Sequence, residues 1–229
     1  MIGVSGLKMT RDIKKEQLRL LAEKRKQHTW PGYAGIGDYH NGAYECDFVS
    51  PYTKTAGNID ADVMVILQDW ASSKFCEKPI NNEAIKDGRV STIRTNVMLD
   101  CLLKEHLGLD ICQIYATNLF PFIKQGVMNL NIPQKDLIKA AKEFALPQMQ
   151  IIQPRVVICL GLKTFNALQS ACTIPTSKRM SDAIASSFQY EESVIFCQAH
   201  TSTQGQNTRN RGGVHRVTAD WESLNAYIK

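Results

Sequence analysis

Three side chains whose types suit acid–base chemistry and ligand recognition follow predicted strands of this chain. Asp69, Asn118 and His200 each come after an apolar run that is typical of a buried strand. A carboxylate and an imidazole can move protons or stabilise charge, and a carboxamide offers both a donor and an acceptor to a ligand. Because open α/β sheets bind ligands at the carboxyl ends of their strands, we expect the three side chains to converge on one rim.

The elements that must position these side chains alternate along the chain between strands and helices. Apolar runs predict strands at 61–68, 113–117, 155–160 and 193–198, with one further short strand at 46–49. Helical spacing and capping residues predict helices at 11–27, 95–107, 133–152, 162–170 and 218–228. This alternation predicts an α/β fold, a three-layer α/β/α sandwich around a central, mainly parallel four-stranded sheet.

The composition is that of an ordinary folded protein. Of 229 residues, 44% are apolar and 21% are charged, which excludes a disordered tail, a fibre, a coiled coil and a disulfide knot. No apolar run is long enough to span a membrane, and residues 1–10 lack the core of a signal peptide. We expect a cytoplasmic monomer, with a basic helix and irregular extension at 1–60 and one α/β domain at 61–229.

The charge of the chain is mildly positive. A formal net charge of +5 and a pI near 8.8 permit binding to a polyanion but do not establish it. Part of this charge falls in the helix predicted at 11–27, whose predicted apolar face consists of Ile13, Leu18, Leu20 and Leu21. That helix either follows the phosphates of a polyanion or packs on the sheet with its charged face in solvent.

The cysteines and histidines give no metal-binding pattern. Seven cysteines without any Cys-x-x-Cys spacing predict free thiols and neither a zinc knuckle nor an iron–sulfur cluster. Asp38, His40, Cys46 and Asp47 are of ligand types, but their spacing matches no common metal site. Turn and strand residues explain them better, so we expect no metal and no cofactor.

Two of the chemistry-bearing segments resemble motifs of the uracil-DNA glycosylase superfamily. Gln68-Asp69 is similar to the Gln-Asp of that superfamily's water-activating motif. Asn118 is similar to its base-reading Asn. The resemblance implies a DNA glycosylase, in which Asp69, aided by Gln68, stabilises the sugar cation and orients the attacking water.

Two further segments extend the resemblance in the same order, so that it covers about residues 60–229. Residues 154–161 resemble a Pro-x-Val-Ile-x-x-Leu-Gly stretch of bacterial branches, and residues 200–202 resemble the His-Pro-Ser motif. By this resemblance His200 donates a hydrogen bond to O2 of the departing base. Asn118 then pairs with O4 and N3–H of a uracil-like edge.

The segment after His200 resembles the loop that wedges into DNA. Gln204 falls at the wedge position, and Ser202, Thr203, Arg209 and Arg211 are the expected DNA contacts. Gly205, Gly212 and Gly213 would let the backbone approach phosphates. The alternative interpretation of this segment is a flexible basic surface turn.

The sequence departs from the family where the pocket meets carbon 5 of the base. The best-known branch follows Gln-Asp with Pro-Tyr-His, and its Tyr excludes thymine, whereas Trp70, Ala71 and Ser72 stand here. The smaller Ala71 leaves the space that this Tyr fills beside carbon 5, which we call the gate, open to a substituent, unless Trp70 fills it. Trp70 and Phe75 are the candidates to stack on the base. We therefore expect the excised base to be a bulky 5-substituted cytosine of phage DNA, removed in anti-phage defence, or uracil, removed in base-excision repair.

Other features set the expected reaction class. Thr201 replaces the Pro of His-Pro-Ser, so the wedge loop loses stiffness. No nucleophilic lysine is evident at a predicted strand end, since Lys74 and Lys163 are most simply surface residues, so we expect a monofunctional enzyme. The alternatives are a non-catalytic module that binds DNA or a flipped base, and a small-molecule nucleoside hydrolase with the same rim.

Overall fold

The central sheet has five strands. A computed structural model describes residues 9–228 of the chain. The strand order is β3-β2-β5-β7-β6. Their bounds are Val63–Asp69 for β2, Tyr115–Phe120 for β3, Val156–Leu160 for β5, Phe188–Tyr190 for β6 and Ser193–Gln198 for β7. The four predicted strands are present and parallel, which confirms the α/β sandwich. The edge strand β6, antiparallel to β7, was not predicted because three residues carry no readable alternation.

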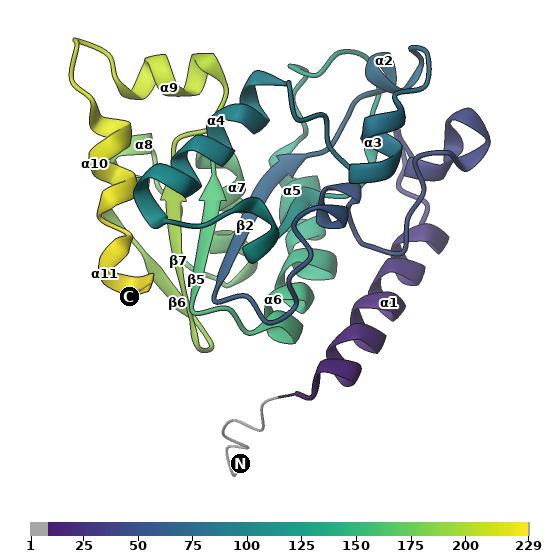
Figure 1. Cartoon of the computed structure of the whole chain (residues 1–229), viewed down its shortest axis with the longest axis horizontal. Coiled ribbons are helices and arrows are strands. Elements are labelled where there is room, and N and C mark those ends of the chain that lie inside the picture. Colours follow the sequence, from purple (N-terminus) through teal and green to yellow (C-terminus); the bar gives the residue numbers. More distant parts are fainter. Residues whose placement is uncertain (1–8, 229) are drawn as a thin grey trace.

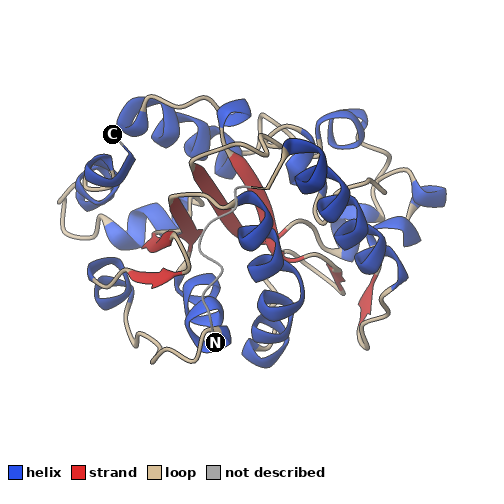
Figure 2. Ribbon diagram, turned by 90° about the horizontal axis from the view of Figure 1, so that it is seen from below, coloured by secondary structure: helices blue, strands red, loops and turns tan. Residues whose placement is uncertain are grey.

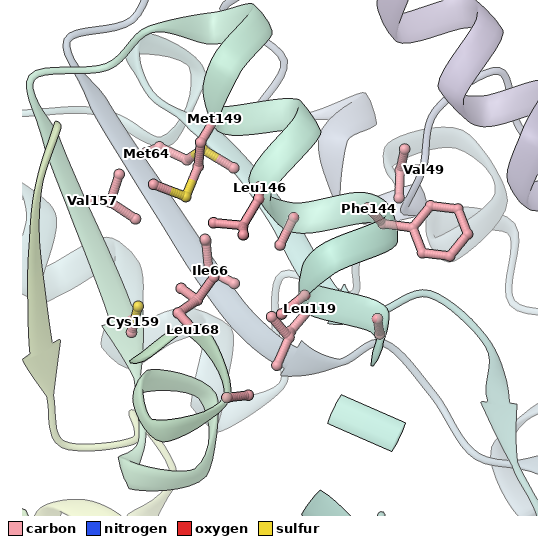
Figure 3. Packing of buried hydrophobic residues seen from close by; sticks show 14 of the residues in the cluster. Val49, Met64, Ile66, Leu119, Phe144, Leu146, Met149, Val157, Cys159 and Leu168 are labelled. Atoms are coloured by element: carbon pink, nitrogen blue, oxygen red, sulfur yellow. The ribbon is translucent and has the colours of Figure 1, made fainter. Parts of the chain in front are cut away.

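Helices cover both faces of this sheet (Figure 2). Alternate residues of β2 divide between the two faces, as a pleated strand requires. Met64 and Ile66 belong to the cluster under one helical layer, where Figure 3 shows Met64 beside Met149, whereas Val65 and Leu67 pack on the opposite face. The first layer holds α5 (Gln134–Ala140), η6 (Ala141–Ala145), α6 (Leu146–Ile152) and α7 (Leu162–Ala171). The second holds α4 (Arg94–Leu102), η4 (Leu103–Leu107), α10 (Arg216–Glu222) and α11 (Asn225–Ile228).

The helix predicted at 133–152 is interrupted by a π turn. The segment η6 separates α5 from α6, and Pro147 stands at the beginning of α6. Proline has no N–H to donate to the carbonyl four residues earlier, that of Glu143. This carbonyl instead accepts a hydrogen bond from Lys24 Nζ at 3.4 Å. The interruption therefore ties the N-terminal helix to the layer over the sheet.

The N-terminal helix α1 (Arg11–Gln27) has the predicted bounds and buries part of the predicted apolar face, including Leu18. Thr10 caps it by accepting the Ile13 N–H. The other predicted leucine on the buried side, Leu21, is also buried, but Ile13 and Leu20 are exposed. Lys14 and Arg25 are buried instead. Their long side chains reach polar partners inside the protein. This helix thus packs on the domain and uses part of its basic face to do so.

Arg25 also explains why no strand forms at 46–49. Its guanidinium donates to the carbonyls of Cys46 and Phe48, at 3.0 and 2.9 Å, and to the Glu45 carboxylate. Carbonyls that accept from a buried arginine have no strand partner, so the strand predicted there is wrong. The neighbouring β1 (Tyr33–Ala34) pairs with β4 (Ile123–Lys124) to form a second, two-stranded sheet.

Several elements differ from the prediction in their bounds or in their type. The helix expected at 218–228 starts at Arg216 and divides into α10 and α11. The turn expected after His200 contains a helix, α9 (Thr203–Arg209). In Figure 1 the arrowheads of β5 and β7 point toward the edge of the molecule where α9 lies. The strand predicted at 113–117 begins at Tyr115, because 111–113 form a 3-10 turn, and it extends to Phe120.

Short elements complete the fold. They are η1 (Ile36–Asp38), η2 (His40–Gly42), η3 (Pro51–Lys54), α2 (Ser73–Cys76), α3 (Asn82–Asp87), η5 (Ile111–Gln113) and α8 (Met180–Ala185). Within residues 9–228, no helix combines the length and the apolar character that crossing a membrane demands.

Candidate active site

Asp69 ends β2 and is almost closed off from solvent. Its side chain is 7% exposed. Gln68 Nε2 donates to Asp69 Oδ1 at 2.8 Å, and Lys124 Nζ lies 2.8 Å from Oδ2. The contact at Oδ2 is an ion pair that lacks hydrogen-bond geometry. The structure thus brings Gln68 and Asp69 together as expected and adds a cation that the sequence analysis missed.

Lys124 is held beside Asp69 from several directions. It lies in β4, opposite Tyr33 of β1, and its backbone forms a bridge with Ser72. Its side chain is 5% exposed, and Nζ also donates to the Met128 carbonyl. The sequence signal was slight, a lysine directly after the apolar residues Phe122 and Ile123.

This placement bears on the expectation of a monofunctional enzyme. Lys74 and Lys163 are exposed, as the sequence analysis expected. Lys124 nevertheless puts a buried amine in contact with the carboxylate at the strand end. The sequence analysis did not weigh this lysine, and the expectation of a monofunctional enzyme stays a prediction.

Asn118 is buried and its amide is fixed by a residue of the N-terminal extension. It lies within β3, not after it, at the register of Leu67 on β2. Ser50 Oγ accepts the Tyr52 N–H and donates to Asn118 Oδ1 at 2.5 Å. Asn118 Nδ2 has no partner among the described residues. One side of the amide is thus occupied, and its donor side is open for a ligand.

His200 lies just after β7 in a fixed tautomer. Its Nδ1 accepts the Ser202 N–H at 3.0 Å, so a neutral ring carries its proton on Nε2. Burial lowers the pKa of His200 below its ordinary value; the Asp69 carboxylate opposes this shift, and the Lys124 charge adds to it. The imidazole is therefore a neutral N–H donor, in electrostatic contact with the other end of the rim.

Two glycines pack against His200 at positions where a side chain would contact it. A Cβ at Gly205 would lie 2.3 Å from the His200 carbonyl oxygen, so the position requires glycine for packing. The expectation that Gly205 lets the backbone approach a phosphate stays a prediction beside this packing requirement. Gly161, which follows β5 with a φ of +97°, packs beside the His200 ring. The same carbonyl of His200 accepts a hydrogen bond from Gln206 Nε2 at 2.9 Å.

The strand ends hold several buried polar atoms that find no hydrogen-bond partner in the described residues. Apart from Asp69 Oδ2, which the Lys124 charge faces, they are Ser72 Oγ, Thr117 Oγ1, Asn118 Nδ2, Gln198 Oε1 and Thr201 Oγ1. Leaving such a group unpaired costs about 1–3 kcal/mol, so proteins seldom gather them without use. Their concentration at the carboxyl ends of the sheet indicates a site for a polar ligand.

Trp70, Ala71 and Phe75 lie together in an apolar cluster with Tyr44. Trp70 packs edge-on against Tyr44 and Phe75, with ring centroids 5.5 and 6.0 Å apart, and its Nε1 donates to the Gly88 carbonyl. Ala71 is 1% exposed. The proposed gate residues are thus neighbours, and an aromatic ring from the N-terminal extension borders them.

A basic cleft opens on the other side of His200. It has a volume of about 1010 Å³. Its lining includes Ser202, which caps α9, and the predicted wedge residue Gln204. Thr203 next to them is exposed. Arg179 and Arg216, which the sequence analysis did not select, line it together with the two predicted arginines.

The two predicted arginines, Arg209 and Arg211, differ in whether their guanidinium groups already have a partner within the protein. Arg209 donates twice to Asp220, at 2.6 and 2.8 Å, and this bond raises the pKa of Arg209. Arg211 is exposed, and only its carbonyl is engaged, by Arg216 Nη1. Arg211 is therefore the better contact for a phosphate, while Arg209 holds α9 to α10.

The residues considered for a metal site have other partners. Asp38 accepts the Gly35 N–H at 2.7 Å, and His40 Nε2 contacts the Lys78 carbonyl. Among the described residues no group of three or more His, Cys, Asp or Glu side chains is arranged to hold a metal ion.

Comparison with known proteins supports part of the resemblance. No family model matches the chain. Among curated proteins, the type-4 uracil-DNA glycosylase of Sulfurisphaera tokodaii is 33% identical over 85 residues. The matched residues span 37% of this chain and 37% of that protein. Over this part of its length, the chain is similar to a uracil-DNA glycosylase.

Proposed function

We propose that the chain is a DNA glycosylase that flips a pyrimidine out of DNA and hydrolyses its N-glycosidic bond, leaving an abasic site. The observation that carries this proposal is a buried carboxylate on the same rim as a neutral imidazole with an N–H to donate. The similarity to a uracil-DNA glycosylase supports DNA as the substrate. A base inside a duplex must leave the stack to reach so enclosed a rim.

The two groups match the charges that the reaction creates. Breaking the glycosidic bond puts positive charge on the sugar and negative charge on the departing base. Asp69 stabilises the sugar cation and orients the water, while Gln68 fixes the carboxylate through Oδ1. His200 Nε2–H donates to O2 of the base as its negative charge grows.

Asn118 reads the edge of the base. Its unpartnered Nδ2 donates to an acceptor on that edge, and Oδ1 keeps a second lone pair beside the Ser50 bond. A buried amide in a fixed orientation rejects an edge with the opposite donor pattern, because the mismatch leaves buried groups unpaired.

The base that we propose is a bulky 5-substituted cytosine of phage DNA, with uracil as the alternative. Ala71 takes up less space than the tyrosine of the best-known branch, and this supports the larger base. Trp70 and Phe75 are the proposed stacking residues, and their cluster with Tyr44 places aromatic surface next to Ala71. The first base implies anti-phage defence and the second implies base-excision repair.

The basic cleft is the proposed path of the DNA backbone. Ser202, Thr203 and Gln204 form the beginning of α9, directly after His200, and Arg211 adds an exposed charge. A phosphate bound there would place the neighbouring nucleotide near the rim.

The proposal is tested by incubating the protein with two DNAs, one containing uracil and one containing glucosylated hydroxymethylcytosine, and then treating them with alkali. We expect strand breaks at the modified base, and Asp69→Asn should slow them by about 10³-fold because its amide cannot stabilise the cation. Asp62→Asn is the matched control, since Asp62 is exposed just before the opposite end of β2.

The outcomes separate the candidate functions. Breaks in the phage DNA support the open gate, and breaks in uracil DNA alone support a repair enzyme whose gate Trp70 closes. Tight DNA binding without any breaks would contradict a glycosylase and indicate a binding module. Cleavage of free nucleosides but not of DNA would indicate a nucleoside hydrolase.

A further inference from the structure

Lys124 is a buried amine that the proposed glycosylase reaction leaves unused. It lies 2.8 Å from the carboxylate that acts on the sugar, in a site with polar atoms still unpaired. A lysine confined beside a reacting carbonyl carbon is the usual arrangement for forming a Schiff base. The product of base excision supplies that carbon, because the abasic sugar opens to an aldehyde at C1′.

We propose that Lys124 condenses with the C1′ aldehyde of the abasic sugar, so that the enzyme also cleaves the DNA strand by β-elimination. This inference rests on the proposed function, since the abasic site is the product of that reaction. It extends that reaction by a second step with its own substrate, DNA that already contains an abasic site.

The step balances with the groups present. Lys124 transfers a proton to Asp69 and becomes an amine, which attacks C1′. The carbonyl oxygen leaves as water after taking up two protons, one from the amine and one returned by Asp69, and a protonated imine remains. The Asp69 carboxylate then removes a proton from C2′, the C3′–O bond breaks, and the 3′ phosphate departs with the electron pair. Asp69 passes the C2′ proton to the departing phosphate, and water hydrolyses the imine, which releases the unsaturated aldehyde and regenerates the lysine.

The contacts of Lys124 suit this role. The Asp69 carboxylate lies 2.8 Å from Lys124 Nζ, so an acceptor for the proton that the lysine must lose is in direct contact with it. The backbone bridge to Ser72 and the pairing with Tyr33 hold Lys124 in place while its side chain moves from Asp69 to the sugar. Lys74 and Lys163 are exposed and have no carboxylate partner among the described residues.

Borohydride trapping tests the inference directly. A duplex with a preformed abasic site is incubated with the protein and sodium borohydride, which reduces an imine to a stable amine. We expect a covalent protein–DNA adduct, and mass spectrometry should locate it on the peptide containing Lys124. Using a preformed site makes the result independent of base excision.

Two variants separate chemistry from folding. Lys124→Arg keeps a cation for Asp69 but cannot form the imine, so the adduct should fall at least tenfold relative to abasic-DNA binding measured in the same sample. Lys74→Arg, at an exposed position of α2, should form as much adduct as the wild type. The melting temperature of each variant shows whether it is folded.

An adduct on another residue, or none with abasic DNA, would overturn the inference. If alkali still revealed abasic sites made from base-containing DNA, the glycosylase proposal would stand without the lyase step. An adduct that persists in a folded Lys124→Arg variant would also exclude Lys124 as the nucleophile.

Discussion

The two ends of the rim are built in different ways. The carboxylate side, which we define as Ser50, Asp69, Asn118 and Lys124, is closed, and none of its side chains is more than 7% exposed. Its contacts join distant segments, since Ser50 and Asn118 are 68 residues apart. The arginine side, defined as His200, Ser202, Arg209 and Arg211, borders an open cleft, and its hydrogen bonds span eleven residues or fewer.

This difference assigns separate tasks to the two sides. A closed site strengthens every electrostatic interaction, so the carboxylate side suits bond breaking and base reading. An open basic cleft binds a strand of any sequence through its phosphates. Only His200 belongs to both, because it lies on the arginine side and its pKa responds to Asp69 and Lys124.

Among the substitutions that test this division, the replacement of His200 should have the largest effect on the rate of base excision. His200→Gln should slow base excision by about 10²–10³-fold, because the donor to the departing base is lost or misplaced. DNA affinity should change little, since the cleft arginines remain. Single-turnover rates and filter binding measure both quantities.

The pH dependence sharpens the same test. Because the pKa of His200 is lowered, its neutral form persists as pH falls below the ordinary value of 6.5. The native state also loses stability as pH falls below 6.5, since the unfolded chain then binds the proton first. Excision by the folded protein should therefore hold through pH 6.5 and decline only at lower pH, where the imidazole takes up its proton, and His200→Gln should lack this decline. The control is His106→Gln in η4; a similar loss of rate there would contradict a specific role for His200.

A smaller effect is expected from Ser50. Ser50→Ala frees the Asn118 amide to rotate and exchange its donor and acceptor. The ratio of excision rates for two bases with opposite edge patterns, uracil and a 5-substituted cytosine, should then move toward one by about tenfold, which equals roughly one lost hydrogen bond.

The control for this prediction is another buried serine. Ser193 Oγ donates to the Pro154 carbonyl at 2.5 Å near the opposite end of the sheet. Ser193→Ala should cost similar stability and leave the ratio of rates unchanged. A ratio that Ser50→Ala leaves unchanged would show that the bond to Ser50 does not set the orientation of Asn118.

The division also explains which parts were predictable from sequence. The parallel strands and the order Asp69, Asn118 and His200 follow from apolar runs and nearby motif residues, which are local signals. Ser50 and Lys124 were missed because each reaches the site through a contact between distant segments. Arg209 was selected for its charge, but a carboxylate eleven residues away engages that charge.

The short helix α9 was missed for a related reason. Its sequence contains Gly205 and several polar residues, which locally favour a turn. The structure shows the Ser202 hydroxyl accepting the Gly205 N–H, and Gln206 bonding to the His200 carbonyl. The need to position His200 thus explains both the helix and its glycine.

The smallest effect should distinguish the two arginines on the open side. Arg211→Ala should weaken DNA binding and reduce the slope of log K against log salt by about one, as expected for one lost phosphate contact. Arg209→Ala should instead leave Asp220 unpaired and lower the free energy of unfolding by about 2 kcal/mol. Its salt slope should stay near that of the wild type, because Asp220 already engages the charge. If both variants changed the slope equally, Arg209 would leave Asp220 when DNA binds, and α9 would have to shift against α10.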